Sequence, residues 1–329
     1  NGRRSPRASH GWPMRTYILS RILLTFPTLF GISVVAFLTI HLIPGNIVEV
    51  MLGTRSDVTP QQIAELNSVY GVDKPLWQQY FIWAGNILHG DLGFSLRTGL
   101  PVTTLLGSSL AVTGELTLLA VALALLIALP LGTFSAVRGG GIGDSVGRLV
   151  SLLALSVPTF WLGTLLILFV SLYIPWLSSF TFVPFFDNPI KNLQIMILPA
   201  FTLALGLSAI LMRMTRAAML DVLGKDYLRT ARAKGLRSTR VLMKHALRNA
   251  LLPVITIIGL QVGYLLGGAV VVENVFTLPG VGRLVVQGIE QRDYPLVQSI
   301  VFVVAALVIL VNLLVDLCYA WIDPRIRYS

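Results

Sequence analysis

Six apolar blocks, each long enough to cross a lipid bilayer, dominate this sequence. A membrane-spanning helix needs about 20 predominantly apolar residues. The blocks that meet this length are 22–43, 116–136, 149–173, 193–212, 251–272 and 296–320. The chain is 55% hydrophobic and only 12% charged, and its mean hydropathy is +0.78. An ordinary soluble enzyme is therefore excluded, and we expect an all-α polytopic membrane protein with six transmembrane helices.

The basic residues are distributed unevenly between the two sides of the predicted membrane. With six crossings both termini lie on one side, and that side carries 19 of the 25 Lys and Arg residues. Ten of these lie in the single connection 213–249. Because positive residues are retained in the cytoplasm, we expect both termini to be cytoplasmic. The net charge of +10 then reflects topology, and we expect no nucleic-acid partner.

The amino-terminal region has the basic start of a secretory signal. Its apolar run is about 22 residues long, however, and ends in Pro44-Gly45-Asn46 without a small-residue cleavage site. We therefore expect an uncleaved first span and a cytoplasmic segment at 1–21. Met14 is a natural start, so residues 1–13 are expected to be leader or added sequence. The single cysteine, Cys318, excludes an intrachain disulfide.

The segment 44–115 between the first two spans is too long for a turn, and we expect a small helical external lobe. Thr59-Pro60-Gln61-Gln62 has the pattern of a capping box, and Asp73-Lys74-Pro75 is expected to open a second helix. Gly90-Asp91-Leu92-Gly93 is typical of a turn. Aromatic residues gather on the second helix: Trp77, Tyr80, Phe81 and Trp83. They suit either the bilayer interface or an external protein partner.

The cytoplasmic loop 213–250 between the fourth and fifth spans has a strong helical pattern despite its charge. Asp226 can cap a short helix that Gly235 ends with a left-handed turn. Residues 236–252 are expected to form a second amphipathic helix that runs into Pro253. The short helix suits either a groove on a cytoplasmic protein or the surface of anionic lipid.

Several motifs of the chain resemble those of one transporter family. The run Asp226 to Leu236, DYLRTARAKGL, with His245 to Pro253, HALRNALLP, resembles the coupling-loop signature of the peptide and nickel branch of ABC-importer permeases. Further likeness is carried by Ile43-Pro44-Gly45, Gly90-Asp91-Leu92-Gly93, Ser156-Val157-Pro158, Leu278-Pro279-Gly280-Val281-Gly282-Arg283, Arg292-Asp293-Tyr294-Pro295 and Asp323-Pro324-Arg325-Ile326-Arg327. The resemblance covers nearly the whole chain from Met14. It is strongest to the first permease subunit of dipeptide importers.

The coupling motif departs from the wider importer family. Where that family has Glu-Ala-Ala, this chain has Arg229-Thr230-Ala231, and the distance from the glycine to the Leu-Pro pair is longer. This is the form of the peptide and nickel branch, which argues against sugar or amino-acid importers.

The resemblance implies a complete assembly. The fold would be the type I ABC-importer permease fold, in the inner (cytoplasmic) membrane of a bacterium. The partners would be a homologous second permease subunit, two cytoplasmic ATPase subunits, an external solute-binding protein and membrane lipid. The residues expected to couple this chain to an ATPase subunit are Asp226, Tyr227, Arg229, Thr230, Ala231, Ala233, Lys234 and Gly235.

Nucleotide and metal chemistry are not expected of this chain. No Gly-x4-Gly-Lys-[Ser/Thr] phosphate loop occurs in the sequence, so ATP and Mg²⁺ would be bound by the partner subunits. The histidines are scattered without metal-ligand spacing, so we expect no metal site and no cofactor. No cluster of nucleophile and base indicates an enzyme.

A few small and polar residues stand out within the spans. Gly259, Gly263 and Gly267 recur every four residues in the fifth span, which favours close packing, and we expect this stripe to contact the second permease subunit. The neighbouring Gln261 and Tyr264 are candidates to face the pathway. Two acidic residues near span ends, Glu115 and Asp316, would pair with a neighbour or snorkel, with a proton relay as the alternative.

The function expected from these observations is the import of di- or oligopeptides. Nickel chelates, glutathione and oligosaccharides are alternative cargoes of the same machinery. A single-chain secondary transporter is the alternative from another class. No inverted repeat, few ionisable residues at midspan and the large basic loop argue against it.

Overall fold

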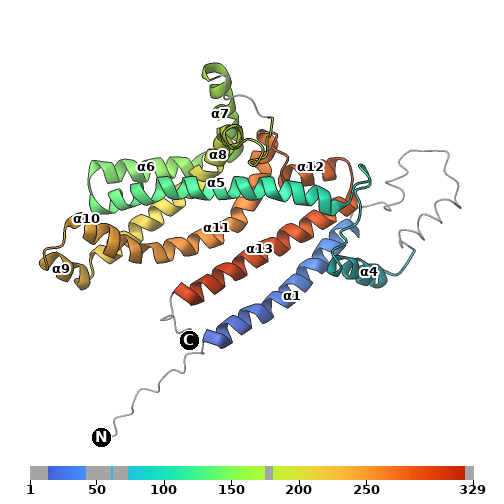
Figure 1. Cartoon of the computed structure of the whole chain (residues 1–329), viewed down its shortest axis with the longest axis horizontal. Helices are drawn as coiled ribbons and strands as arrows, with labels where there is room; N and C mark the ends of the chain where they lie inside the picture. The colour runs from blue at the N-terminus through green and yellow to red at the C-terminus, as the bar shows by residue number, and fades with distance from the viewer. Residues whose placement is uncertain (1–13, 42–60, 62–72, 175–180, 323–329) are drawn as a thin grey trace, which may run out of the picture. The chain divides into compact units, whose positions relative to one another are not determined.

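The computed structural model of the chain describes residues 14–41, 61, 73–174 and 181–322 (Figure 1). Within these residues the regular structure is helical, and the only extended pairing is an isolated bridge between Phe94 and Pro101. The helices are α1 Met14–His41, α4 Leu76–Leu88, α5 Val102–Val137, α6 Ile142–Ser156, α7 Thr159–Tyr173, α8 Pro189–Leu223, α9 Asp226–Ala233, α10 Ser238–Arg240, η2 Val241–Leu247, α11 Arg248–Val275, α12 Val281–Glu290 and α13 Tyr294–Ile322. Our expectations for residues 1–13, for the helix opened by Thr59 and for the tail after Ile322 lie outside the described residues.

The chain divides into two compact units, which we describe separately. Unit 1 comprises residues 1–91 and 298–329, and its described part holds α1, α4 and most of α13. Aromatic side chains join these helices. Tyr80 of α4 shares a 2.8 Å hydrogen bond with Ser33 of α1, and the ring centroids of Trp83 and Phe302 lie 5.7 Å apart. Tyr80 and Trp83 therefore pack on long apolar helices of this unit, whereas Trp77 and Phe81 of the same helix are exposed.

Unit 2, residues 92–297, is built around α5 and α8, which run side by side (Figure 1). Small residues allow this close approach: Ala120, Ala124, Ala128 and Gly132 recur every four residues on α5 and are all buried. A β-carbon at Gly132 would lie 2.7 Å from the Met212 carbonyl oxygen of α8. Helices in lipid associate mainly through such close packing. We call these four small residues of α5, together with the face of α8 that they contact, the seam between α5 and α8.

The expected third span, 149–173, is divided into two helices. α6 and α7 meet at an angle of 99° across Val157 and Pro158. Proline has no backbone N–H to donate, and it pushes the preceding residue out of the helical region. Val157 accordingly has extended backbone angles, φ −82° and ψ 121°. The break thus follows from the Ser156-Val157-Pro158 sequence.

Five helices or continuous helical runs of the described chain are long and apolar enough to span a membrane, or six if the bent α6–α7 pair counts as one span. This confirms the all-α, multi-span class expected from hydropathy. Some helices extend beyond their apolar blocks. α5 begins at Val102, and α11 passes through Pro253 without interruption and continues a run that starts at Ser238.

Candidate functional site

The predicted coupling helix is present as α9, Asp226–Ala233. Gly235 has a φ of +76°, and the Leu236 amide bonds back to the Ala231 carbonyl, so the helix ends in the left-handed turn that we expected. Asp226 is the first residue of the helix and not its cap. Its carboxylate instead lies 3.6 Å from the Arg229 guanidinium.

A buried apolar cluster, the coupling cluster, holds α9 on the rest of unit 2. Its fully or nearly buried members are Ala136, Met219, Val222, Leu228, Val241, Ala246 and Ala250. Leu228 is the α9 member and is 0% exposed, while Ala231 packs against the cluster from the side. The cluster joins α5, α8, α9, η2 and α11. Through this cluster α9 is packed against three long helices, α5, α8 and α11.

The outer surface of α9 combines small and polar side chains. Thr230 and Ala233 of α9 are exposed, as is Lys234 just after the helix. Tyr227 is 44% exposed, and its hydroxyl accepts a 2.8 Å hydrogen bond from Asn249 at the start of α11. The residues expected to take part in coupling are thus divided between an anchoring side and an exposed side.

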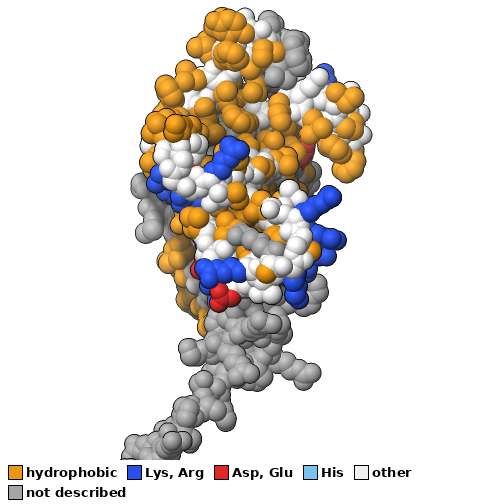
Figure 2. All heavy atoms as spheres, turned by 90° about the vertical axis from the view of Figure 1, so that its left-hand side faces the viewer, with side chains coloured by type: hydrophobic (Ala, Val, Ile, Leu, Met, Phe, Trp, Pro, Cys, Tyr) orange, Lys and Arg blue, Asp and Glu red, His pale blue; other side chains and the backbone are white. Residues whose placement is uncertain are grey.

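Basic side chains surround this end of unit 2. Figure 2 looks onto the end that carries α9 and α10, and Lys and Arg side chains gather there beside hydrophobic ones. The exposed basic residues from the end of α8 to the start of α11 are Arg213, Lys225, Arg229, Lys234, Arg237, Arg240, Lys244 and Arg248. The surface is positively charged and is suited to an acidic protein face or to anionic lipid.

Next to the coupling cluster lies a buried ion pair that the sequence did not reveal to us. The Asp144 side chain, at the start of α6, is 1% exposed and accepts two 2.7 Å hydrogen bonds from the Arg216 guanidinium of α8. Ser135 of α5 donates to the same carboxylate, as does the Gly140 amide. One acidic side chain therefore ties the ends of α5, α6 and α8 together.

A second buried acid, Glu273, lies at the other end of α11 and was also missed. It is 0% exposed, and its carboxyl group accepts from the Thr113 hydroxyl of α5 at 2.6 Å and from the Arg283 amide of α12 at 3.1 Å. Thr113 in turn accepts from the Val281 amide at 2.9 Å. We call Glu273, Thr113 and the amides of Val281 and Arg283 the Glu273 clamp.

The glycines of the Leu278 to Arg283 motif make room for the Glu273 clamp. A β-carbon at Gly280 would overlap the Glu273 carboxyl group, and one at Gly282 would overlap the backbone of Val270. The acid and the Pro-Gly-x-Gly pattern that follows it are the signal that could have located this site.

The glycines that recur every four residues in the fifth span, Gly259, Gly263 and Gly267, become more exposed along α11. Gly259 is buried, Gly263 and Gln261 are half-buried, and Gly267 is exposed with open space beside it. Tyr264 is 79% exposed. Ile257, which we expected on another face, packs against the core of unit 2. The structure therefore leaves the part of the stripe around Tyr264 and Gly267 uncovered.

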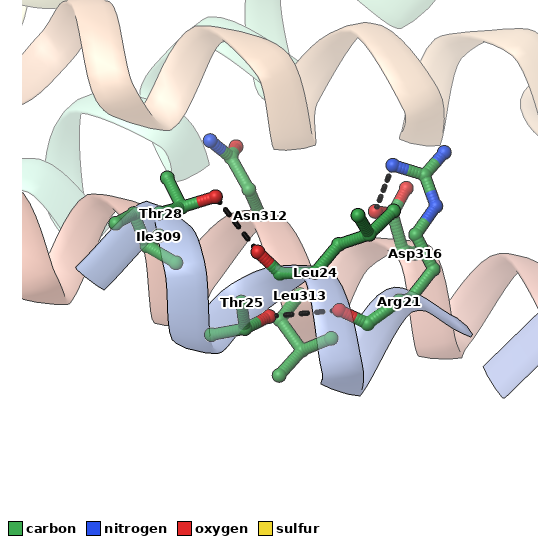
Figure 3. Close-up of a pocket in the computed structure, with 8 residues that line it drawn as sticks. All are labelled: Arg21, Leu24, Thr25, Thr28, Ile309, Asn312, Leu313 and Asp316. Carbon is green, nitrogen blue, oxygen red and sulfur yellow. Dashed lines mark hydrogen bonds and ion pairs between the residues drawn. The ribbon is translucent and has the colours of Figure 1, made fainter. Parts of the chain in front are cut away.

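A cleft of about 190 Å³, lined by both polar and apolar side chains, lies between α1 and α13 in unit 1 (Figure 3). Arg21 and Asp316 point toward each other across it and form a 3.1 Å ion pair, which is the pairing that we expected for Asp316. The hydroxyls of Thr25 and Thr28 donate hydrogen bonds to carbonyls one turn earlier in α1.

Glu115, which we expected near the start of the second span, is half-buried. It lies well inside α5, because that helix already begins at Val102.

Comparison with known proteins identifies the class. Residues 128–328 match the family described as binding-protein-dependent transport system inner membrane component, and residues 14–117 match the N-terminal domain of such membrane components. The chain belongs to this family.

Full-length relatives give the comparison more detail. The chain is 42% identical over 339 residues to the dipeptide transport system permease protein DppB of Escherichia coli (strain K12). It is 42% identical over 320 residues to the oligopeptide transport system permease protein AppB of Bacillus subtilis (strain 168). It is 41% identical over 316 residues to the glutathione transport system permease protein GsiC of Pectobacterium atrosepticum. Each comparison covers 96% of this chain and 100% of the relative.

Proposed function

We propose that this chain is one of two pore-forming permease subunits of an ATP-driven importer of di- and oligopeptides. Two ATPase subunits would bind on the cytoplasmic side and hydrolyse ATP, and a solute-binding protein would deliver cargo from outside. The observation that supports this most strongly is the full-length similarity to permeases named for dipeptide and oligopeptide transport. The family's binding-protein-dependent character accounts for the external partner.

The site for the ATPase subunit in this proposal is the exposed side of α9. Leu228 anchors the helix in the coupling cluster, while Thr230 and Ala233 remain exposed. Small exposed side chains allow a groove of the partner to close around the helix. ATP-driven closure of the ATPase pair would push α9, and the coupling cluster would pass the movement to α5, α8 and α11.

The orientation follows from the positive-inside count. It places α9, the coupling cluster and the Asp144–Arg216 pair in the cytoplasm, and it places α4 and α12 outside. The uncovered part of α11 around Gly267 would then contact the second permease subunit and border the pathway, with Gln261 and Tyr264 near the cargo.

The experiment that tests this function uses the full transporter. The chain would be co-expressed with its partner permease, its ATPase subunits and its binding protein, and the complex would be placed in proteoliposomes. We expect ATP-dependent uptake of labelled dipeptides. Uptake of glutathione or of a nickel chelate in place of peptides would overturn the cargo, and uptake by this chain alone would overturn the assembly.

A variant of α9 tests the coupling site within the same complex. Ala233→Trp adds bulk to the exposed side without touching the coupling cluster, and Thr239→Trp, at a position that is also exposed, is the control outside α9. We expect only Ala233→Trp to abolish uptake and binding of the ATPase subunits. If Ala233→Trp instead weakens association with anionic vesicles and leaves ATPase binding intact, α9 is a lipid-binding helix.

A further inference from the structure

The helix α12, Val281–Glu290, is fastened at both ends by buried acidic side chains. At its start, Glu273 of α11 accepts hydrogen bonds from the Arg283 amide and from Thr113 of α5. Just past its end, Asp293 is 1% exposed and accepts from the Ser95 hydroxyl and the Leu96 amide. Such contacts to buried carboxyl groups are costly to break, because each lost donor leaves an enclosed polar group unpaired.

The two fastenings connect α12 to different parts of unit 2. The Glu273 clamp joins it to α5 and α11, which are membrane-spanning helices. The Asp293 contacts join its far end to the loop before α5, and the Arg97 guanidinium adds a 2.7 Å hydrogen bond to the Gln291 carbonyl. Hydrogen bonds are directional, so bonds at both ends restrict sliding of α12 more than apolar contacts alone would.

The space around the Glu273 clamp leaves little freedom for adjustment. The carboxyl group fills the position that a side chain at residue 280 would need, and Gly282 lies directly against the backbone of α11 at Val270. Val281 and Gly282 are themselves buried. The start of α12 is therefore in backbone contact with α11.

We propose that Glu273 is a positioning residue for transport, which makes α12 move as one rigid piece with α5 and the adjoining end of α11. On the proposed orientation, α12 lies at the external end of the pathway. It would follow the spans when nucleotide moves them, and it would not open as a separate lid. This inference rests on the proposed function, because both of its readouts use the assembled, ATP-driven transporter.

The first measurement is the distance between α12 and α5 in the assembled transporter in lipid nanodiscs. Spin labels would be placed at Ser108 and Gln287, which are both exposed, with Cys318 replaced by serine. We expect one narrow distance distribution that is the same without nucleotide and with ATP trapped. A distance that differs between these two states would overturn the proposal.

The second measurement compares two threonines of α5 in the same complex. Thr113→Val removes the hydroxyl that bridges Glu273 and Val281, while Thr113→Ser keeps it. Thr117→Val is the matched control, because Thr117 is also buried but donates only to the Thr113 carbonyl of its own helix. Glu273→Gln, which keeps the side-chain volume, is a second test of the clamp.

We expect Thr113→Val and Glu273→Gln to broaden the distance distribution and to lower the binding-protein-stimulated ATPase rate about tenfold, as the loss of a buried hydrogen bond would. Basal ATPase activity and assembly should be unchanged, and Thr113→Ser and Thr117→Val should behave as wild type. An unchanged stimulated rate, or equal loss of basal and stimulated rates, would overturn the proposal. If the wild-type complex shows no stimulation at all, the proposed function fails instead.

Discussion

The carboxylate of Asp144 and the guanidinium of Arg216 form a two-point ion pair, with both contacts at 2.7 Å, although the residues lie 72 positions apart in the chain. The pair joins the start of α6 to α8 one turn before Met219 of the coupling cluster. A break in this pair would loosen the α6 corner beside the elements that hold α9.

We therefore expect Asp144→Asn to lower the thermal stability of the purified chain and to uncouple ATP hydrolysis from uptake in the complex. The remaining Arg216 would be left half-buried without its partner. Arg148→Ala is the control, since Arg148 is exposed and lies 3.7 Å from the same carboxylate. The double variant Asp144→Arg with Arg216→Asp should recover part of the stability. Equal stability of Asp144→Asn and Arg148→Ala would contradict the importance of the buried pair.

The seam between α5 and α8 predicts opposite effects for two glycines of one helix. Gly132→Ala should destabilise the chain by about 1 to 3 kcal/mol, because its β-carbon would press on the Met212 carbonyl. Gly114→Ala has open space around it and should be neutral or stabilise the helix by up to about 1 kcal/mol. Thermal unfolding of the two variants in the same lipid measures the difference. If both changes have the same effect, the close contact at Gly132 is not what holds the helices together.

Cysteine labelling tests the orientation of the chain. In a Cys318→Ser background, a membrane-impermeant maleimide should reach Asp187→Cys in intact cells, because the loop before α8 is expected outside. Ser238→Cys should react only after permeabilisation. Both positions are exposed, so a difference in labelling reports the side of the membrane. The opposite pattern would place both termini outside.

The uncovered face of α11 predicts where the second permease subunit binds. Gly267→Cys and Leu260→Cys should form cross-links to cysteines of the partner permease, since Gly267 has open space beside it and Leu260 is 58% exposed. Ile257→Cys should not, because it packs into unit 2. Gly263→Leu should separate the subunits or block uptake. Cross-links from residue 257 alone would refute this interface.

Hydropathy was sufficient to predict which segments are apolar helices, because lipid imposes both length and composition on a span. Local turn chemistry was sufficient for the end of α9, since Gly235 adopts the left-handed conformation that glycine favours. The aromatic helix α4 after Pro75 was also predicted correctly. These features depend on residues close together in the chain.

The features that we missed depend on contacts between residues far apart in the chain or on helix segments that extend outside the apolar blocks. The Asp144–Arg216 pair and the contact between Thr113 and Glu273 join residues separated by 72 and 160 positions, so no local pattern shows which partners meet. Only the position of the Glu273 clamp has a local signal, in the glycines at 280 and 282 that follow the acid. Hydropathy also could not show that α5 continues to Val102, because a helix that leaves the bilayer no longer needs apolar residues. The bend at Val157 and Pro158 could have been predicted, since a proline inside an apolar block already favours a break.

The seam between α5 and α8 also has a consequence for the order of events during synthesis. About 50 residues separate the end of α5 at Val137 from the start of α8 at Pro189. At roughly 5 to 20 residues per second, the ribosome takes several seconds to produce them. During that time α8 has not yet been synthesised, so the small residues of α5 have no helix to pack against. α5 must therefore remain in the membrane for several seconds before α8 can pack on it. Chaperones that shield newly synthesised membrane helices would act on this chain in that interval.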